Sequence, residues 1–450
     1  MKASRGGTGD RFGGWQAEGA GKSECATPFF RSRAGESEGA GRRTMTTAAT
    51  PARHRIGSAF EVLAAFLKLG CTSFGGPVAH LGYFRAEFVA RRRWVDEATY
   101  ADIVALCQLL PGPASSQTGI SLGLLRAGIP GAFCAWLGFT LPSAAALIFF
   151  GYGVNALGGV AGAPWLHGLK IVAVAVVGLA VWNMARSLAP DRPRATLAIA
   201  GAVLALAIPS TAGQVGAIVL GGIAGALLPA SHSPRSGASG FHLPIGRGWA
   251  LAALLAFFLL LFGLPPLAQA SESHALHLLA SFYRSGALVF GGGHVVLPLL
   301  QASVVPPGWI GNDAFLAGYG AAQAVPGPLF TFAAYLGTVM YPSPHGWAGG
   351  LLCLIAIYLP SFLLLAGALP LWGALRRHPA MQRALRGINA AVVGLLLAAL
   401  YQPVWTSAIT AAPDFLLGIV AFLLLAFWRV PPWLVVLLGA AAAEAMAFIA

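Results

Sequence analysis

Long apolar segments recur along most of the chain and carry few charges. Four of them are Gly131–Phe150, Ile171–Val181, Leu251–Leu261 and Phe415–Phe427. A helix that crosses the hydrocarbon core of a bilayer needs about 20 predominantly apolar residues. The many Gly and Ala residues in these segments favour helices that pack closely inside a membrane. The pattern therefore predicts an all-α polytopic membrane protein.

Glycine and proline interrupt this apolar pattern at two motifs, and each motif occurs twice. FGG begins at Phe74 and again at Phe290, and PGP occupies Pro111–Pro113 and Pro326–Pro328. Lipid cannot satisfy the backbone groups that such interruptions free, so a break survives only inside protein or beside a watery cavity. We expect broken helices or re-entrant hairpins at all four motifs. A competing topology makes the hairpins full spans and raises the number of crossings.

The two pairs of motifs belong to an internal repeat. A shift of 215 or 216 residues superimposes both motif pairs, and other matched positions follow in order. These matches include Lys68 with Arg284, Trp94 with Trp309, Gln108 with Gln323, and Pro142-Ser143 with Pro360-Ser361. Two homologous halves are predicted at residues 57–229 and 275–450. The linker 230–274 contains an extra apolar segment, Trp249–Leu267, which predicts one linking transmembrane helix.

Basic loops alternate between the two halves. The chain carries Arg91–Arg93 after the first FGG motif, whereas the equivalent segment Leu299–Asp313 contains neither Lys nor Arg. Because basic residues concentrate in cytoplasmic loops, the alternation predicts repeats of inverted topology. In that topology almost all Lys and Arg beyond residue 44 are cytoplasmic. The exceptions are Lys68, Lys170 and Arg284.

The composition narrows the remaining choices. Hydrophobic residues make up 57% and charged residues 10% of the chain, whereas soluble domains average about 25% charged residues. In a membrane protein, a net charge of +13 is typical of a chain with basic cytoplasmic loops. The chain contains no aromatic-basic array, so we do not expect nucleic acid as a partner. The five cysteines lack metal-ligand spacing, so we expect buried small side chains and no metal or cofactor.

Residues 1–44 differ from the rest of the chain. They are rich in Gly, Arg, Ser and Glu and show no apolar periodicity. Two interpretations remain open, a disordered tail or a start codon placed upstream of the true start at Met45. We therefore treat residues 1–56 as an N-terminal extension outside the fold.

The interruptions also predict a binding site. A helix that restarts after a break directs unpaired N–H groups and the positive end of its dipole into the site, which suits a small anion. Lys68 and Arg284 each precede an FGG motif by six residues and would supply cations. The substrate-binding candidates are Lys68, Gly75, Gly76, Pro77, His80, Gln108, Pro111, Gly112, Pro113, Ser115, Ser116, Arg284, Gly291, Gly292, Gly293, His294, Gln323, Pro326, Gly327, Pro328 and Thr331.

Asp102 and Glu87 are the candidates for proton coupling. These two residues and the substrate-binding candidates could all have structural roles instead. The glycines could serve close helix packing, the PGP motifs could be ordinary loops, and the histidines could be structural. Lys68 and Arg284 could reach the membrane interface. Glu87 could offset the neighbouring arginines, and Asp102 could stabilise the start of its helix.

The motifs resemble those of the chromate ion transporter family. The segment FLKLGCTSFGGPVAHLGYFRAEFVARRRWVDEATYADIVALCQLLPGPASSQ resembles the first-half signature of that family, and FGGGHVVLPLL and AAQAVPGPLFTFAAYLG resemble its second-half signature. The resemblance covers roughly residues 57–450. It implies a long-chain, two-domain member with antiparallel halves. It also implies efflux of chromate, with sulfate as a close analogue, across the cytoplasmic (inner) membrane, which confers chromate resistance.

Other functions remain as alternatives. The chain contains no Walker A sequence, which favours secondary transport, with proton antiport as one coupling. A membrane-bound reductase is disfavoured because no dinucleotide fingerprint or paired metal ligands occur, so we do not expect an enzyme. A channel is a further alternative. Sulfate or another oxyanion, taken up rather than exported, fits the same shape and charge. The sequence leaves a homodimer open.

Overall fold

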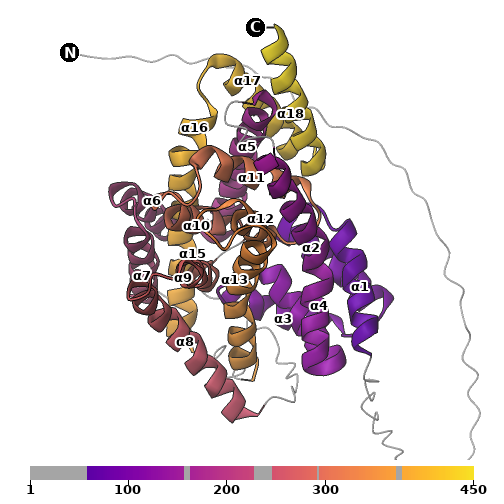
Figure 1. The fold of residues 1–450 in the computed structure, drawn as a ribbon. Helices are drawn as coiled ribbons and strands as arrows, with labels where there is room; N and C mark the ends of the chain where they lie inside the picture. Colours follow the sequence, from indigo (N-terminus) through magenta and orange to yellow (C-terminus); the bar gives the residue numbers. More distant parts are fainter. Residues whose placement is uncertain (1–57, 157–162, 228–245, 291–292, 371–377, 450) are drawn as a thin grey trace, which may run out of the picture. The chain divides into compact units, whose positions relative to one another are not determined.

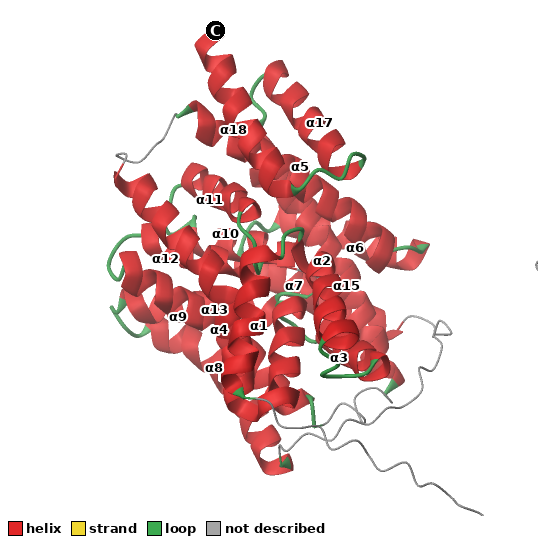
Figure 2. Cartoon of the chain, turned by 90° about the vertical axis from the view of Figure 1, so that its right-hand side faces the viewer, coloured by secondary structure: helices red, strands yellow, loops and turns green. Residues whose placement is uncertain are grey.

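The computed structural model describes residues 58–156, 163–227, 246–290, 293–370 and 378–449. All regular elements among these residues are helices, as Figure 2 shows. Five helical stretches are long and apolar enough to cross a membrane: Ala114–Ala156, Pro164–Leu188, Gly248–Gln269, Gly346–Ala368 and Pro379–Ala408. The prediction of an all-α polytopic membrane protein is thus confirmed. The N-terminal extension lies outside the described residues.

The first half begins with short helices and continues with longer ones (Figure 1). Its elements are α1 (Ala59–Thr72), α2 (Gly76–Phe84), a π-helical turn (Arg85–Arg91), α3 (Glu97–Leu109), α4 (Ala114–Ala156), α5 (Pro164–Leu188), α6 (Arg192–Ala207) and α7 (Thr211–Leu227). Helix α4 bends at Ala127 and Gly128, whose backbone angles are not helical. The bend divides α4 into a short segment and a long one.

The second half repeats this order after the linking helix α8 (Arg247–Gln269), which lies where the sequence predicts one. Its elements are α9 (His274–Leu288), a 3-10 turn (Gly293–Val295), α10 (Val296–Val304), α11 (Asn312–Ala324), a second 3-10 turn (Leu329–Thr331), α12 (Phe332–Val339), α13 (Gly346–Ala368), α15 (Pro379–Ala399), a π-helical turn (Leu400–Trp405), α16 (Thr406–Ala408), α17 (Ala412–Ala426) and α18 (Pro432–Ile449). Helices break at both FGG and both PGP motifs, as predicted.

Side-chain caps help to set where the helices of the first half begin. Ser58 accepts a hydrogen bond from the Glu61 amide at the start of α1, and Asp96 accepts one from Thr99 at the start of α3. These are the residue types that satisfy the free N–H groups of a first helical turn. By contrast, α2 begins after Gly75 without a side-chain cap.

The last two long helices of each half pack against a helix of the other half. Helix α15 of the second half packs on α6 and α7 of the first, and α5 of the first half packs on α17 and α18 of the second. Figures 1 and 2 both show α17 and α18 beside α5. Small residues allow the backbones of α15 and α7 to lie close together. A Cβ on Gly387 in α15 would meet the Gly221 carbonyl oxygen and lie 2.6 Å from Gly225 Cα in α7. Contacts of this kind hold helices together in lipid.

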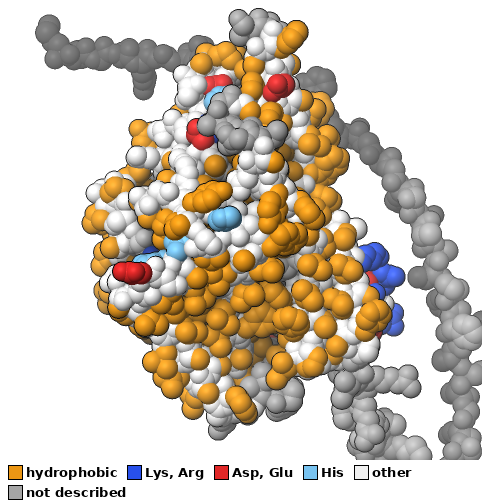
Figure 3. All heavy atoms as spheres, in the orientation of Figure 1, with side chains coloured by type: hydrophobic (Ala, Val, Ile, Leu, Met, Phe, Trp, Pro, Cys, Tyr) orange, Lys and Arg blue, Asp and Glu red, His pale blue; other side chains and the backbone are white. Residues whose placement is uncertain are grey.

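Apolar side chains cover most of the face shown in Figure 3, whereas Lys and Arg gather at one edge. Large hydrophobic residues are exposed on several helices, among them Phe149 of α4, Phe262 of α8 and Leu416 of α17. A soluble protein rarely exposes apolar patches of this extent. These surfaces fit contact with lipid tails.

Candidate functional site

Backbone hydrogen bonds tie each PGP motif to the FGG motif of the other half. The Gly112 amide donates to the carbonyl oxygen of Val289 at 2.6 Å, and the Gly327 amide donates to that of Ser73 at 2.9 Å. Val289 directly precedes the second FGG motif and Ser73 directly precedes the first. The bonds are therefore reciprocal, and all four interruptions meet in one region.

Both PGP glycines also lie against a serine of the other half. A Cβ on Gly112 would lie 2.7 Å from Ser361 Oγ, and one on Gly327 would lie 2.8 Å from Ser143 Oγ. The two glycines have φ angles of +120° and +101°, a region that disfavours other residues. Since Ser143 and Ser361 are matched positions of the repeat, these contacts too are reciprocal.

A cavity of about 140 Å³ opens beside these interruptions. A single water needs about 10–15 Å³ of such space, so the cavity has room for a small hydrated ion. Both halves contribute to its wall. The described lining residues are Gly75, Gly76, Pro77, Val176, Leu179, Ala180, Asn183, His294, Ala322, Gln323, Val325, Gly327, Leu329, Leu425 and Pro432.

The cavity wall offers several hydrogen-bond donors. Helix α2 begins at Gly76 after an uncapped Gly75 with φ of +97°, so its first-turn N–H groups lack side-chain acceptors. Gln323 Nε2 is buried without a hydrogen-bond partner. His294 Nδ1 lies 2.8 Å from the Tyr319 hydroxyl, and the Asn183 amide completes the polar lining. With no carboxylate among the described lining residues, this arrangement suits a small anion.

The two predicted cations do not line this cavity. Lys68 is exposed on α1, and Arg284 is half-buried on α9 with its Nε unpartnered. A role for Lys68 and Arg284 in anion binding stays a prediction.

Matched positions of the repeat differ in their surroundings. Gln323 lines the cavity, but its counterpart Gln108 is exposed on α3 and does not. His80 and His294 follow the two FGG motifs at positions that are not matched, and they differ as well: His80 is buried with Nδ1 3.4 Å from Ser115 Oγ, whereas His294 reaches the cavity. The sequence offered no signal to separate the members of each pair, because the difference arises from neighbouring helices.

The remaining candidates lie around the breaks rather than on the cavity wall. A Cβ on Gly293 would lie 3.5 Å from Pro77 Cγ, so the two FGG segments adjoin each other. Thr331 Oγ1 donates to the Pro328 carbonyl oxygen at 2.7 Å. Gly291 and Gly292 lie outside the described residues. The other candidates absent from the cavity wall are Pro111, Pro113, Ser116 and Pro326.

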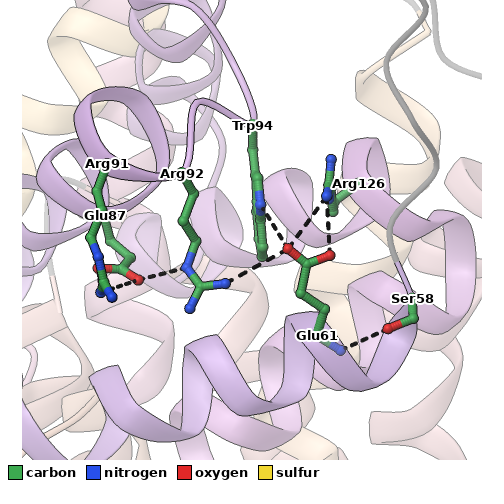
Figure 4. Close-up of polar contacts among 7 residues, drawn as sticks. All are labelled: Ser58, Glu61, Glu87, Arg91, Arg92, Trp94 and Arg126. Atoms are coloured by element: carbon green, nitrogen blue, oxygen red, sulfur yellow. Dashed lines mark hydrogen bonds and ion pairs between the residues drawn. The ribbon is translucent and has the colours of Figure 1, made fainter.

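Glu87 is engaged in ion pairs, as Figure 4 shows. It accepts hydrogen bonds from Arg91 at 2.8 Å and from Arg92 Nε at 2.6 Å. Burial alone would raise the pKa of this carboxyl, but the hydrogen bonds from Arg92 and Arg91 hold it below its usual value. These contacts match the alternative in which Glu87 offsets the arginines. Asp102, the other proton-coupling candidate, is buried on α3.

A second carboxylate in the same region joins α1 to α4. Glu61 accepts from Arg126 at 3.0 Å and from the Trp94 indole at 3.3 Å (Figure 4). Lys170, one of the three cations that the predicted topology does not place in the cytoplasm, pairs with Asp313 at 3.0 Å and so joins α5 to α11. Both pairs link separate helices, and sequence spacing alone could not reveal them.

The described residues contain no cluster of His, Cys, Asp and Glu that could hold a metal ion. Cys107 and Cys353 are buried and Cys134 is partly buried, but Cys71 is exposed on α1. The expectation of buried cysteines is thus wrong for Cys71, which lies on the outer face of its helix. Cys25 lies outside the described residues.

Comparison with known proteins identifies relatives that match most of the chain. The chromate transporter family model matches residues 60–226 and again residues 276–444. A probable chromate transport protein of Synechococcus elongatus is 26% identical over 376 residues, which are 81% of this chain and 88% of that protein. A chromate transport protein of Pseudomonas aeruginosa is 28% identical over 342 residues, 75% of this chain and 79% of that protein. No solved structure matches the chain.

Proposed function

Because the chain belongs to the chromate transporter family, we propose that it exports chromate from the cytoplasm as a secondary transporter and binds it in the cavity beside the four helix breaks. The observation that carries this proposal is the cavity wall, to which breaks of both halves contribute donors. Chromate is a tetrahedral dianion, so uncapped N–H groups and the free Gln323 amide complement its oxygens. Membership in a transporter family also argues against an enzyme.

The double negative charge of chromate supports transport out of the cell. The membrane potential acts on each elementary charge with about 2.3 kcal/mol per 100 mV. An inside-negative potential therefore drives a dianion out of the cell, and proton exchange would add to that force. In a cytoplasmic membrane, such export would confer chromate resistance.

The reciprocal bonds between the halves support alternating access. Gly112 with Val289 and Gly327 with Ser73 are the pairs that a two-fold relation between the repeats predicts. Inverted repeats that rock against each other expose a central site to one side of the membrane at a time. We extend this mechanism to the present chain.

Chromate flux tests the proposed function. In inverted membrane vesicles, we expect chromate uptake that rises with an inside-positive potential and responds separately to the pH gradient. The control is a set of vesicles from the same host without the protein. Uptake of sulfate with chromate ignored would replace the proposed substrate, and flux independent of both gradients would contradict secondary transport.

Cysteine labelling tests the inverted topology. Pro307 and Ala90 are exposed residues in corresponding parts of the two halves. In a background without native cysteines, Pro307→Cys should react with an impermeant maleimide from outside the cell, and Ala90→Cys only after the membrane is opened. Equal reactivity of both from the same side would show that the repeats are parallel.

A further inference from the structure

Four buried polar side chains gather where α4 meets α13. The hydroxyls of Ser116, Thr140 and Tyr358 have no partner of standard geometry, and neither has the Trp136 indole nitrogen. Ser116 is 3% exposed, and Thr140 and Tyr358 are each 1% exposed. The Tyr358 hydroxyl is within hydrogen-bonding reach of the Ser116 and Thr140 hydroxyls, and its ring packs against Trp136 at 5.7 Å between centroids.

We define Ser116, Trp136, Thr140 and Tyr358 as the hydroxyl cluster. Folded proteins contain few unsatisfied buried polar groups. Here the three hydroxyls can satisfy one another only in part, and the Trp136 indole nitrogen has no partner. Each can donate a hydrogen bond, and none of the four is a carboxylate.

The internal repeat places the cluster at the contact between the halves. Thr140 and Tyr358 are 218 positions apart, the same shift that relates Pro142 to Pro360. The two residues are therefore matched positions that face each other. Ser116 adds a third donor from the first turn of α4, directly after the first PGP motif, where helix N–H groups favour an anion.

A short chain of contacts connects the cluster to the cavity. Gly327 lines the cavity and lies against Ser143 of α4. The Ser143 hydroxyl donates to the Thr140 carbonyl oxygen at 3.1 Å. Thr140 of the hydroxyl cluster thus lies about one helical turn along α4 from Ser143, which contacts the cavity wall.

We propose that the hydroxyl cluster is a second oxyanion site, in which the tetrahedral ion is held between the halves after it leaves the cavity. This inference rests on the proposed function, because it takes the cavity as the point of entry. Hydroxyl and indole donors from both halves replace the water that the ion loses. Their number and placement make Tyr358 and Thr140 determinants of oxyanion affinity.

Ligand-dependent thermal stability tests this site without a transport assay. The purified protein would be titrated with sulfate and, separately, with chromate, because an ion that binds the folded state raises the melting temperature. We expect Tyr358→Phe and Thr140→Val to raise the half-saturating concentration at least tenfold. Thr140→Ser retains the hydroxyl and should remain close to the natural protein.

Tyr335→Phe is the matched control. Tyr335 is as deeply buried as Tyr358, but its hydroxyl donates to the Ala314 carbonyl oxygen at 2.9 Å. This variant should melt at a lower temperature and keep its half-saturating concentration. A purely structural role of Tyr358 would give the same result for Tyr358→Phe, and the hydroxyl cluster would then hold bridging water only.

The outcomes separate this inference from the proposed function. Unchanged ion affinity in Tyr358→Phe and Thr140→Val overturns the second site, even if the natural protein exports chromate. The absence of any stabilisation by either ion overturns it as well. Binding that depends on Tyr358, in a protein that does not export chromate, supports the site and contradicts the proposed direction or substrate.

Discussion

Gly387→Leu is expected to prevent the two halves from assembling. Gly387 of α15 lies directly against the backbone of α7, where a Cβ would meet the Gly221 carbonyl oxygen and lie 2.6 Å from Gly225 Cα. Neither neighbour is a flexible side chain, so the helices themselves must separate. Helix association in lipid depends on this close packing, and overpacking alone costs about 1–3 kcal/mol where the structure can adjust.

The measurement is the fraction of detergent-extracted protein that elutes as a single species in size-exclusion chromatography. We expect that fraction to be almost lost for Gly387→Leu. Gly263→Leu is the control, because Gly263 is exposed on α8 and a Cβ there would meet nothing within 4 Å. Equal yields of the two variants would show that α7 and α15 do not pack as described.

Gln323→Leu is expected to weaken chromate transport by about 10- to 100-fold in half-saturating concentration. Gln323 lines the cavity with a buried, unpartnered amide nitrogen, and leucine keeps a similar volume but removes the donor. Hydrogen bonds to charged groups contribute about 1.5–3 kcal/mol. The measurement is initial chromate uptake in inverted vesicles over a range of concentrations, normalised to the amount of folded protein.

The repeat supplies the control for this variant. Gln108 is the matched position in the first half, but it is exposed and does not line the cavity. Gln108→Leu should therefore leave the half-saturating concentration unchanged. If both variants behave alike, the binding site lies elsewhere or uses the two halves equally.

The sequence predicted the helices and their interruptions well because those depend on local residues. Apolar segments, FGG and PGP determine where helices run and stop, and the matched motifs revealed two similar halves. The packing of the last helices of each half on a helix of the other half was not predicted. It depends on small residues such as Gly225 and Gly387, which meet across 162 positions of the chain.

Some of the predicted binding residues lie together in the structure. Gly75, Gly76, Pro77, His294, Gln323 and Gly327 reach one cavity. Lys68 and Arg284 do not, because a position six residues before a break gives neither the distance nor the face of the helix. Asn183 was missed because α5 approaches the breaks only in the folded protein. Tyr358 and Thr140 carried a usable signal, since they occupy matched positions beside Pro360 and Pro142.

The most direct test of the central claim is the position of the anion in crystals grown with chromate. Anomalous scattering from chromium would locate it without assumptions about the protein. The account predicts a peak in the cavity, with an oxygen about 3 Å from Gln323 Nε2, and a second peak at the hydroxyl cluster if the ion is also held there. A peak found only elsewhere, such as between Lys68 and Arg284, would contradict it.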